Sequence, residues 1–330
     1  SWCPPGCRCA QGAPHRPSRT RAPCQQRGAR GISRDRRPTA SSTMQANCLA
    51  PLFTVVTLSE RLPVQQLCEG FATSALLPTR KYLALRFFLA CCMVYGMVWD
   101  GATYSKLATA NASCFGYLAF FTSWALVTEC VYLVLAVVAT SMAQTALSPA
   151  SDATPLRKAQ STIEKCEAVK PLLVLVGILQ VIAVEVSFVA FFMYWVCVLP
   201  SYHLQESRVA YLEQHPATFA AHGVNFLVMA VDICFSRQPF GLCDAVWTVA
   251  YSLFYVCFSL AYYLAGGVRP YDGSPAMYPF LDWRRPATTI ACLSGILVMI
   301  LGMHWAIWSV KFVQLAPSKL GKAGQLTNTV

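Results

Sequence analysis

Six long apolar runs, separated by short polar segments, occupy almost all of the chain after residue 80. The runs comprise residues 82–98, 115–142, 172–199, 219–234, 242–264 and 288–310. A helix that crosses a bilayer needs about 20 largely apolar residues, so the first and fourth runs need additional residues from their flanks. The runs are continuous and lack the ~10-residue alternating strands of a transmembrane β-barrel. The pattern therefore predicts an all-α, polytopic membrane helical bundle of about six transmembrane helices.

The overall composition agrees with this prediction. Hydrophobic residues make up 55% of the chain and charged residues 12%, and the mean hydropathy is +0.45, a balance that is rare in soluble domains of this length. We expect one membrane domain at 81–312, a cytoplasmic N-terminal segment at 44–80 and a cytoplasmic tail at 313–330. The protein is thus expected to be an integral protein of the plasma membrane or an endomembrane.

The net charge of +11 is concentrated at the N-terminus. Residues 1–43 hold nine arginines and one acid, Asp35, a net +8, so that +3 remains for the rest of the chain. This segment has no apolar stretch that would serve as a signal peptide. We interpret it as translated sequence upstream of a start at Met44; the alternative is a disordered basic leader that touches anionic lipid or RNA.

With the charge located there, we expect membrane lipids as partners and no nucleic acid. The four cysteines of residues 1–43 have no histidine at a metal-ligand spacing. We therefore expect neither a metal nor a cofactor.

The positions of Lys and Arg between the runs predict the orientation of the bundle. Eleven of them lie on the side that carries both termini, and five lie in the opposite loops. Because cytoplasmic loops carry the excess of positive charge, both termini are expected to be cytoplasmic.

We expect an epitope tag at the C-terminus to bind antibody only after cells are permeabilised, because the charge bias of eleven to five places that end inside. Immunofluorescence on intact and permeabilised cells measures this directly. A tag in one of the opposite loops is the control and should stain intact cells when the protein is at the surface. Staining of the C-terminal tag in intact cells contradicts the predicted orientation.

Ionisable residues within the runs are informative, because a charge at the centre of a bilayer costs about 2.5–3.5 kcal/mol on insertion scales. Glu129, Glu185, Asp232 and His304 lie inside the runs and are expected to face the bundle interior. Arg86 lies near the cytoplasmic end of the first run and is expected to snorkel. Interhelical hydrogen bonding and ion or proton transport both fit such residues. The absence of broken half-helices and repeated halves argues against a secondary transporter.

Two polar residues lie at similar depths below the same membrane face. Counted from the start of its own run at 1.5 Å per residue, Thr122 lies about 10 Å deep and His222 about 5–8 Å deep. Helical spacing continues the face of Thr122 through Leu126 and Glu129, and that of His222 through Asn225, Met229 and Asp232. Two polar stripes that point into one bundle form a candidate internal site.

A neutral imidazole near a threonine hydroxyl can remove its proton and make it a nucleophile. Thr122 and His222 are thus the candidate catalytic pair. Asn225 and the backbone N–H groups near Ser123 and Trp124 are candidate oxyanion donors. No third member of a triad is visible, because Glu129 and Asp232 lie about 10 Å or more below their partners. From these residues alone, the favoured interpretation is that Thr122 is an interior hydroxyl and His222 an interfacial histidine, and that neither takes part in catalysis.

Several segments resemble the rolling stone family of multipass membrane proteins. They are HGVNFLVMAVD at 222–232, SRQPF at 236–240, YYLAGG at 262–267, YPFLDW at 278–283, and the segment from Tyr117 to Trp124, in which the family more often has Asn at the place of Ser123. The resemblance covers about residues 80–312. It implies a multipass protein of the plasma membrane or endomembranes that is associated with myoblast fusion.

A more distant resemblance is to the androgen-induced and androgen-dependent membrane hydrolases, which cleave fatty-acid esters of hydroxy fatty acids. It rests on Phe121-Thr122 with Leu126, Val127 and Val131, on His222-Gly223, and on YPFL at 278–281. It implies catalytic roles for Thr122 and His222. The chain departs from that pattern at Asp282, at Asn225 and in the expected loop at 143–170.

Two function classes follow from these resemblances. The first is an intramembrane threonine hydrolase that acts on a lipid ester. The second is a non-catalytic membrane protein that acts in cell fusion, adhesion or membrane organisation.

Overall fold

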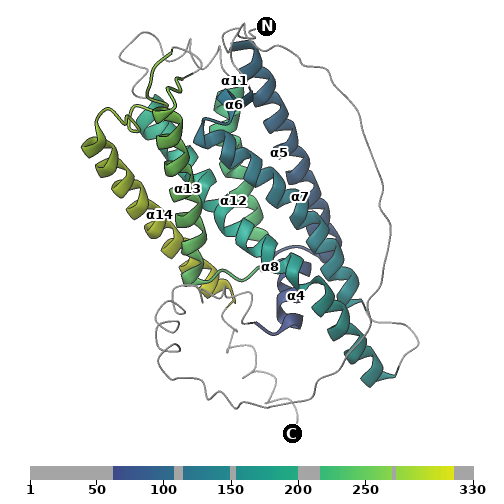
Figure 1. The fold of residues 1–330 in the computed structure, drawn as a ribbon. Coiled ribbons are helices and arrows are strands. Elements are labelled where there is room, and N and C mark those ends of the chain that lie inside the picture. Colours follow the sequence, from purple (N-terminus) through teal and green to yellow (C-terminus); the bar gives the residue numbers. More distant parts are fainter. Residues whose placement is uncertain (1–61, 108–113, 149–153, 200–215, 270–272, 316–330) are drawn as a thin grey trace, which may run out of the picture. The chain divides into compact units, whose positions relative to one another are not determined.

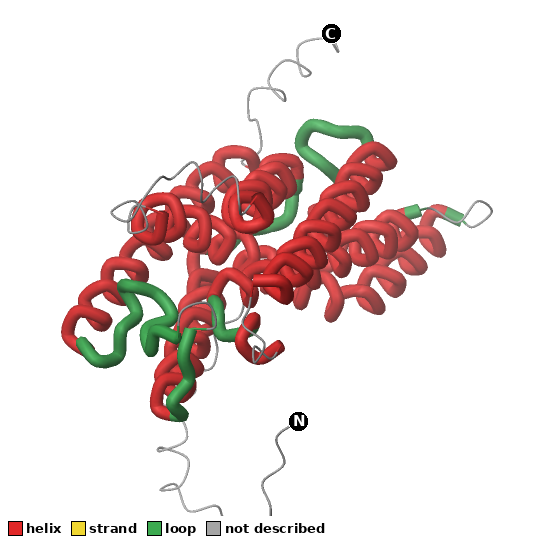
Figure 2. The backbone as a smooth tube through the Cα atoms, turned by 90° about the horizontal axis from the view of Figure 1, so that it is seen from above, coloured by secondary structure: helices red, strands yellow, loops and turns green. Residues whose placement is uncertain are grey.

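The computed structural model describes residues 62–107, 114–148, 154–199, 216–269 and 273–315. The N-terminal 61 residues and the tail from 316 lie outside these ranges, so the expectations for the leader and the tail remain predictions. The described chain is helical, with isolated bridges in place of strands (Figure 2). The predicted all-α class is therefore confirmed.

The helices follow the predicted apolar runs with extensions at their ends. They are α4 (Val64–Ala72), α5 (Thr79–Leu107), α6 (Cys114–Tyr117), α7 (Phe121–Leu147), α8 (Pro155–Met193), α11 (Pro216–Phe219), α12 (Asn225–Phe235), α13 (Ala245–Leu264) and α14 (Pro286–Leu315), with π-helical turns η1 (Tyr194–Val198) and η3 (Ala220–Val224) and a 3₁₀ turn η4 (Leu242–Asp244). Within the described residues, five helices are long and apolar enough to cross a membrane, and a shorter apolar helix covers Ala220–Phe235. A sixth membrane crossing, made by Ala220–Phe235 together with the flanking residues Pro216–Phe219, remains a prediction.

The helix α8 is the centre of the bundle. It contacts α4, α7, α12, α13 and α14, whereas α5 packs on α7 and α12, and α14 packs on α13 and α8 (Figure 1). Small and β-branched residues line much of its buried surface, among them Val181, Ala183, Val186 and Ala190. Such side chains let neighbouring helices approach closely within a membrane.

Large apolar side chains remain on the outside of the bundle. Phe88 is 62% exposed, Phe254 67% and Val298 70%, on three different helices. In water such a surface would mark an interface, but around apolar helices of this length it is the surface that faces lipid. This supports a multipass membrane protein.

Two expectations about helix boundaries are wrong. The 143–170 segment is not a loop, because α7 continues to Leu147 and α8 begins at Pro155. The second run is not a continuous helix either, because the chain leaves helical geometry at residues 118–120, between α6 and α7. Thr122 therefore lies in the first turn of α7.

Arg86 does not snorkel. Its side chain is fully buried, and its Nε donates to Oδ1 of Asp232 at 2.9 Å. Its remaining donors reach Oγ1 of Thr140 at 2.7 Å and Oε1 of Gln238 at 2.5 Å. The guanidinium thus joins α5, α7, α12 and the turn after α12 in one polar cluster, since it satisfies groups that face inwards from each of them. Lys311 lies near the end of α14, is buried, and donates to the Ser236 carbonyl.

Candidate active site

The start of α7 is held in place by hydrogen bonds from side chains that are distant in sequence. The Phe121 N–H donates to the hydroxyl of Tyr278 at 3.0 Å, and the Tyr255 hydroxyl donates to the Ala119 carbonyl at 2.9 Å. Trp124 also donates its ring N–H to the Leu118 carbonyl at 2.6 Å. These contacts satisfy backbone groups that the break in the helix leaves unpaired, and they fix the turn that carries Thr122.

Two π-helical turns face the start of α7. Tyr194 begins η1 at the end of α8, and His222 lies in the middle of η3. Their rings stack with centroids 3.9 Å apart and planes 7° apart. The stack fixes the plane of the imidazole. Single π-helical turns inside α-helices are rare and occur frequently at functional sites.

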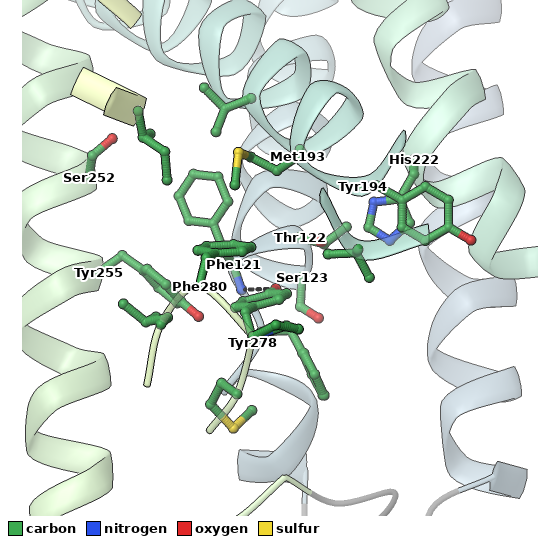
Figure 3. A pocket seen from close by; sticks show the side chains of 18 of the residues that line it. Phe121, Thr122, Ser123, Met193, Tyr194, His222, Ser252, Tyr255, Tyr278 and Phe280 are labelled. Carbon is green, nitrogen blue, oxygen red and sulfur yellow. Dashed lines mark hydrogen bonds between the residues drawn. The ribbon is translucent and has the colours of Figure 1, made fainter. Parts of the chain in front are cut away.

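A cavity of about 440 Å³ lies between these elements. Thr122, Ser123 and His222 are all on its wall. In Figure 3, His222 and Tyr194 lie on one side of it, whereas Ser252 and Tyr255 of α13 lie on the other. The wall also includes many apolar side chains, among them Phe121, Met193, Phe280, Leu293 and Ile296. Its volume lies in the usual range for small-molecule sites.

The structure brings the two polar stripes to the same interface. Thr122 and His222 share the cavity wall, and the fully buried Glu129 lies beside Asn225. One turn further along α7, the Tyr132 hydroxyl donates to Oδ2 of Asp232 at 2.5 Å. The α7 stripe and the α12 stripe therefore run next to each other from the cavity into the bundle.

The backbone N–H groups at the start of α7 differ in availability. The N–H of Trp124 donates to the Phe120 carbonyl at 3.4 Å, so it is not a free oxyanion donor. Within the described residues, no backbone acceptor is bonded to the N–H of Thr122 or Ser123. The first-turn N–H groups of a helix are available to a negatively charged oxygen. Asn225 is not among the residues of the cavity wall; its amide oxygen accepts from the Phe226 N–H at 2.6 Å, and its amide nitrogen has no partner among the described residues.

Most of the buried acids are paired with groups other than His222. Asp232 pairs with Arg86 at 2.9 Å, and Oε1 of Glu185 lies 2.5 Å from Nδ1 of His304. The other ring nitrogen of His304 lies 3.0 Å from the Gly241 carbonyl, to which it donates. In the described part of the chain, no hydrogen bond joins Thr122 to His222, and no carboxylate contacts His222 directly.

The loop that carries YPFL closes one side of the cavity. Met277, Tyr278, Pro279, Phe280 and Leu281 line the wall. The loop is anchored to α14 by the Thr289 hydroxyl, which donates to the Asp282 carbonyl at 2.8 Å, and Arg284 makes a bidentate contact with the Asp282 carboxylate at 2.8 and 2.9 Å. The Arg284 guanidinium holds the pKa of the Asp282 carboxyl below its ordinary value. Asp282 is thus a loop anchor and does not belong to the chemistry of the cavity.

Sequence comparison supports a family assignment for this arrangement. The family model described as "Protein rolling stone" matches residues 107–316, which include both stripes and the YPFL loop. The chain belongs to the rolling stone family. Within this family, "Protein rolling stone" of Drosophila melanogaster is 29% identical over 86 residues, which cover 26% of this chain and 30% of that protein. The aligned part is thus less than a third of that relative. No solved structure matches the chain.

Several site residues were missed by sequence reasoning. Tyr194, Tyr255 and Asp100 line the cavity, and the Tyr278 hydroxyl holds the start of α7. Aromatic residues within apolar runs give no sequence signal that separates a cavity wall from packed core. Tyr278 could have been singled out from the sequence, because it lies in one of the segments that carry the rolling stone resemblance.

Proposed function

We propose that this member of the rolling stone family is an intramembrane hydrolase of fatty-acid esters. The observation that carries the proposal is the shared position of Thr122 and His222 on the wall of one largely apolar cavity. The resemblance to the androgen-induced and androgen-dependent hydrolases supports these two roles independently. A cavity bounded by aromatic and aliphatic side chains accepts an acyl chain, and the two polar residues meet its ester group.

In this mechanism the Thr122 hydroxyl attacks the ester carbonyl carbon, and its proton passes to the free ring nitrogen of His222. The carbonyl oxygen gains negative charge and is stabilised by the N–H groups of Thr122 and Ser123, together with the positive end of α7. The C–O bond then breaks, and His222 gives its proton to the departing alcohol. Water, activated by His222, hydrolyses the acyl-threonine and releases the fatty acid.

A second function is supported by the pairing of the acids. Because Asp232 and Glu185 are paired elsewhere and Thr122 is not hydrogen-bonded to His222, the same cavity fits a lipid-binding protein without chemistry. Such a protein would act in cell fusion, adhesion or membrane organisation. The experiment below separates the two functions.

We expect an alkyl fluorophosphonate to label the purified full-length protein on Thr122. Labelling should fall by about 100-fold or more in Thr122→Ala, because the acylated oxygen is gone. Ser123→Ala is the matched control, since it removes the neighbouring cavity hydroxyl and should leave the label in place. In-gel fluorescence and peptide mapping measure both. Equal labelling of wild type and Thr122→Ala, or no label at all, favours the lipid-binding alternative.

A further inference from the structure

Below the cavity, the interface between α7 and α12 holds buried polar atoms without a partner. Glu129 is fully buried, and neither of its carboxyl oxygens has a hydrogen bond among the described residues. Nδ2 of Asn225 and Nδ1 of His222 are likewise buried and unpaired in this part of the chain. A buried carboxyl left unpaired is costly, so these atoms indicate a bridging molecule.

The three side chains occupy adjacent levels of one interface. The Asn225 amide lies beside the Glu129 carboxyl, and His222 precedes Asn225 by three residues on the same helical stretch. Side chains of a helix tilt towards its N-terminus, which for α7 is the end that borders the cavity. We therefore expect the Glu129 side chain to lean back towards the level of His222.

One water molecule at this place satisfies the unpaired atoms. Buried waters typically make about three hydrogen bonds to groups that lack other partners. Here Nδ1–H of His222 donates to the water, the water donates to Glu129, and the Asn225 amide donates to either oxygen. This arrangement places the hydrogen of the imidazole on Nδ1 and leaves Nε2, on the cavity side, free to accept the Thr122 proton.

We propose that Glu129 is a positioning residue that holds His222 in its catalytic tautomer through a water held by Asn225. The proposal rests on the proposed function, because it supplies the acid that the Thr122–His222 pair otherwise lacks. Glu129 is the acid that fits, because it is buried beside Asn225 and, like Nδ1 of His222, lacks a hydrogen-bond partner among the described residues. Asn225, the neighbour of Glu129, follows His222 by three residues, about 4.5 Å along the helix at 1.5 Å per residue, and one bridging water spans such a separation.

Other charged and titratable groups line the same cavity as His222. Asp100 of α5 lines the same cavity but accepts from the Tyr117 hydroxyl at 2.9 Å. Tyr194 of η1 covers one face of the imidazole, and Arg269 lies on the cavity wall. Asp100→Asn is therefore the matched control, because it removes a cavity carboxyl that has its own partner.

The test measures His222 directly, so it does not require hydrolysis. Diethylpyrocarbonate reacts with neutral imidazole, and peptide mapping of the full-length protein in lipid nanodiscs gives the extent of reaction at His222 against pH. A nearby carboxylate favours the imidazolium, so Glu129→Gln should move the midpoint about one pH unit lower. Asn225→Leu should also lower the midpoint. Glu129→Asp keeps a carboxylate and should leave the midpoint close to the wild-type value, and Asp100→Asn should leave it unchanged.

Fluorophosphonate labelling of Thr122 should fall by about ten-fold or more in Glu129→Gln if the link serves catalysis. A shifted His222 midpoint in a protein that takes no label overturns the proposed function and keeps the link between Glu129 and His222. An unchanged midpoint in Glu129→Gln and in Asn225→Leu overturns the link, whatever the labelling shows. A shift in Asp100→Asn alone assigns the role to Asp100 and overturns it too.

Discussion

Arg86→Ala is expected to lower the stability of the bundle by about 3–5 kcal/mol. The substitution leaves Asp232 buried without its cation, and it also removes the donors that reach Thr140 and Gln238. For a domain of this size the melting temperature should fall by about 10 °C. Thermal unfolding of the purified protein in detergent measures the change.

Arg80→Ala is the matched control, because Arg80 is an exposed arginine on the same helix. It should change stability by no more than about 0.5 kcal/mol. The double variant Arg86→Ala with Asp232→Ala should cost less than the sum of the two single variants, since it leaves no unpaired charge. A loss for Arg86→Ala no larger than that for Arg80→Ala would show that the buried pair does not hold the helices together.

His222→Phe is expected to lower ester hydrolysis by about 10²- to 10⁴-fold, because the variant lacks the nitrogen that takes the Thr122 proton. The phenyl ring keeps an aromatic partner for Tyr194, whose ring lies 3.9 Å from that of His222. Folding and thermal stability should therefore stay close to wild type. Hydrolysis of a fluorogenic fatty-acid ester by the purified protein is the measurement.

His222→Ala removes the base and the stacked ring together. It should lose the same activity as His222→Phe but also about 1 kcal/mol of stability, the worth of an aromatic pair. Together the two variants separate chemistry from packing. Retained hydrolysis in His222→Phe would rule out His222 as the base.

Much of the fold was predictable because the membrane restricts what a chain can do. An apolar run in a bilayer satisfies its backbone groups as a helix, so the runs at 82–98 and 288–310 were found as α5 and α14. The inward direction of Glu129 and Asp232 followed from the cost of a charge in lipid. Helical spacing then placed each on a stripe with Thr122 or His222.

Other features depend on contacts between distant segments and left no periodic signal. Arg86 and Asp232 are 146 residues apart, and nothing local to Arg86 shows that an acid, an amide and three hydroxyls surround it. The break before Thr122 needs Tyr278 and Tyr255 to satisfy the freed backbone, and neither is near it in sequence. Tertiary partners therefore decided both the burial of Arg86 and the position of the nucleophile within its helix.

The seam between α7 and α13 has a consequence for how a lipid reaches the cavity. Trp124 packs against Tyr251, Tyr255, Phe254 and Phe258, and Phe121 packs against Tyr251 and Tyr255. A hydrocarbon chain that slides between these rings exchanges one set of dispersion contacts for another of similar strength. Under the proposed function, a fatty-acid ester would therefore enter from the side along this seam at little cost in contact energy, whereas a water molecule would gain no such contacts there.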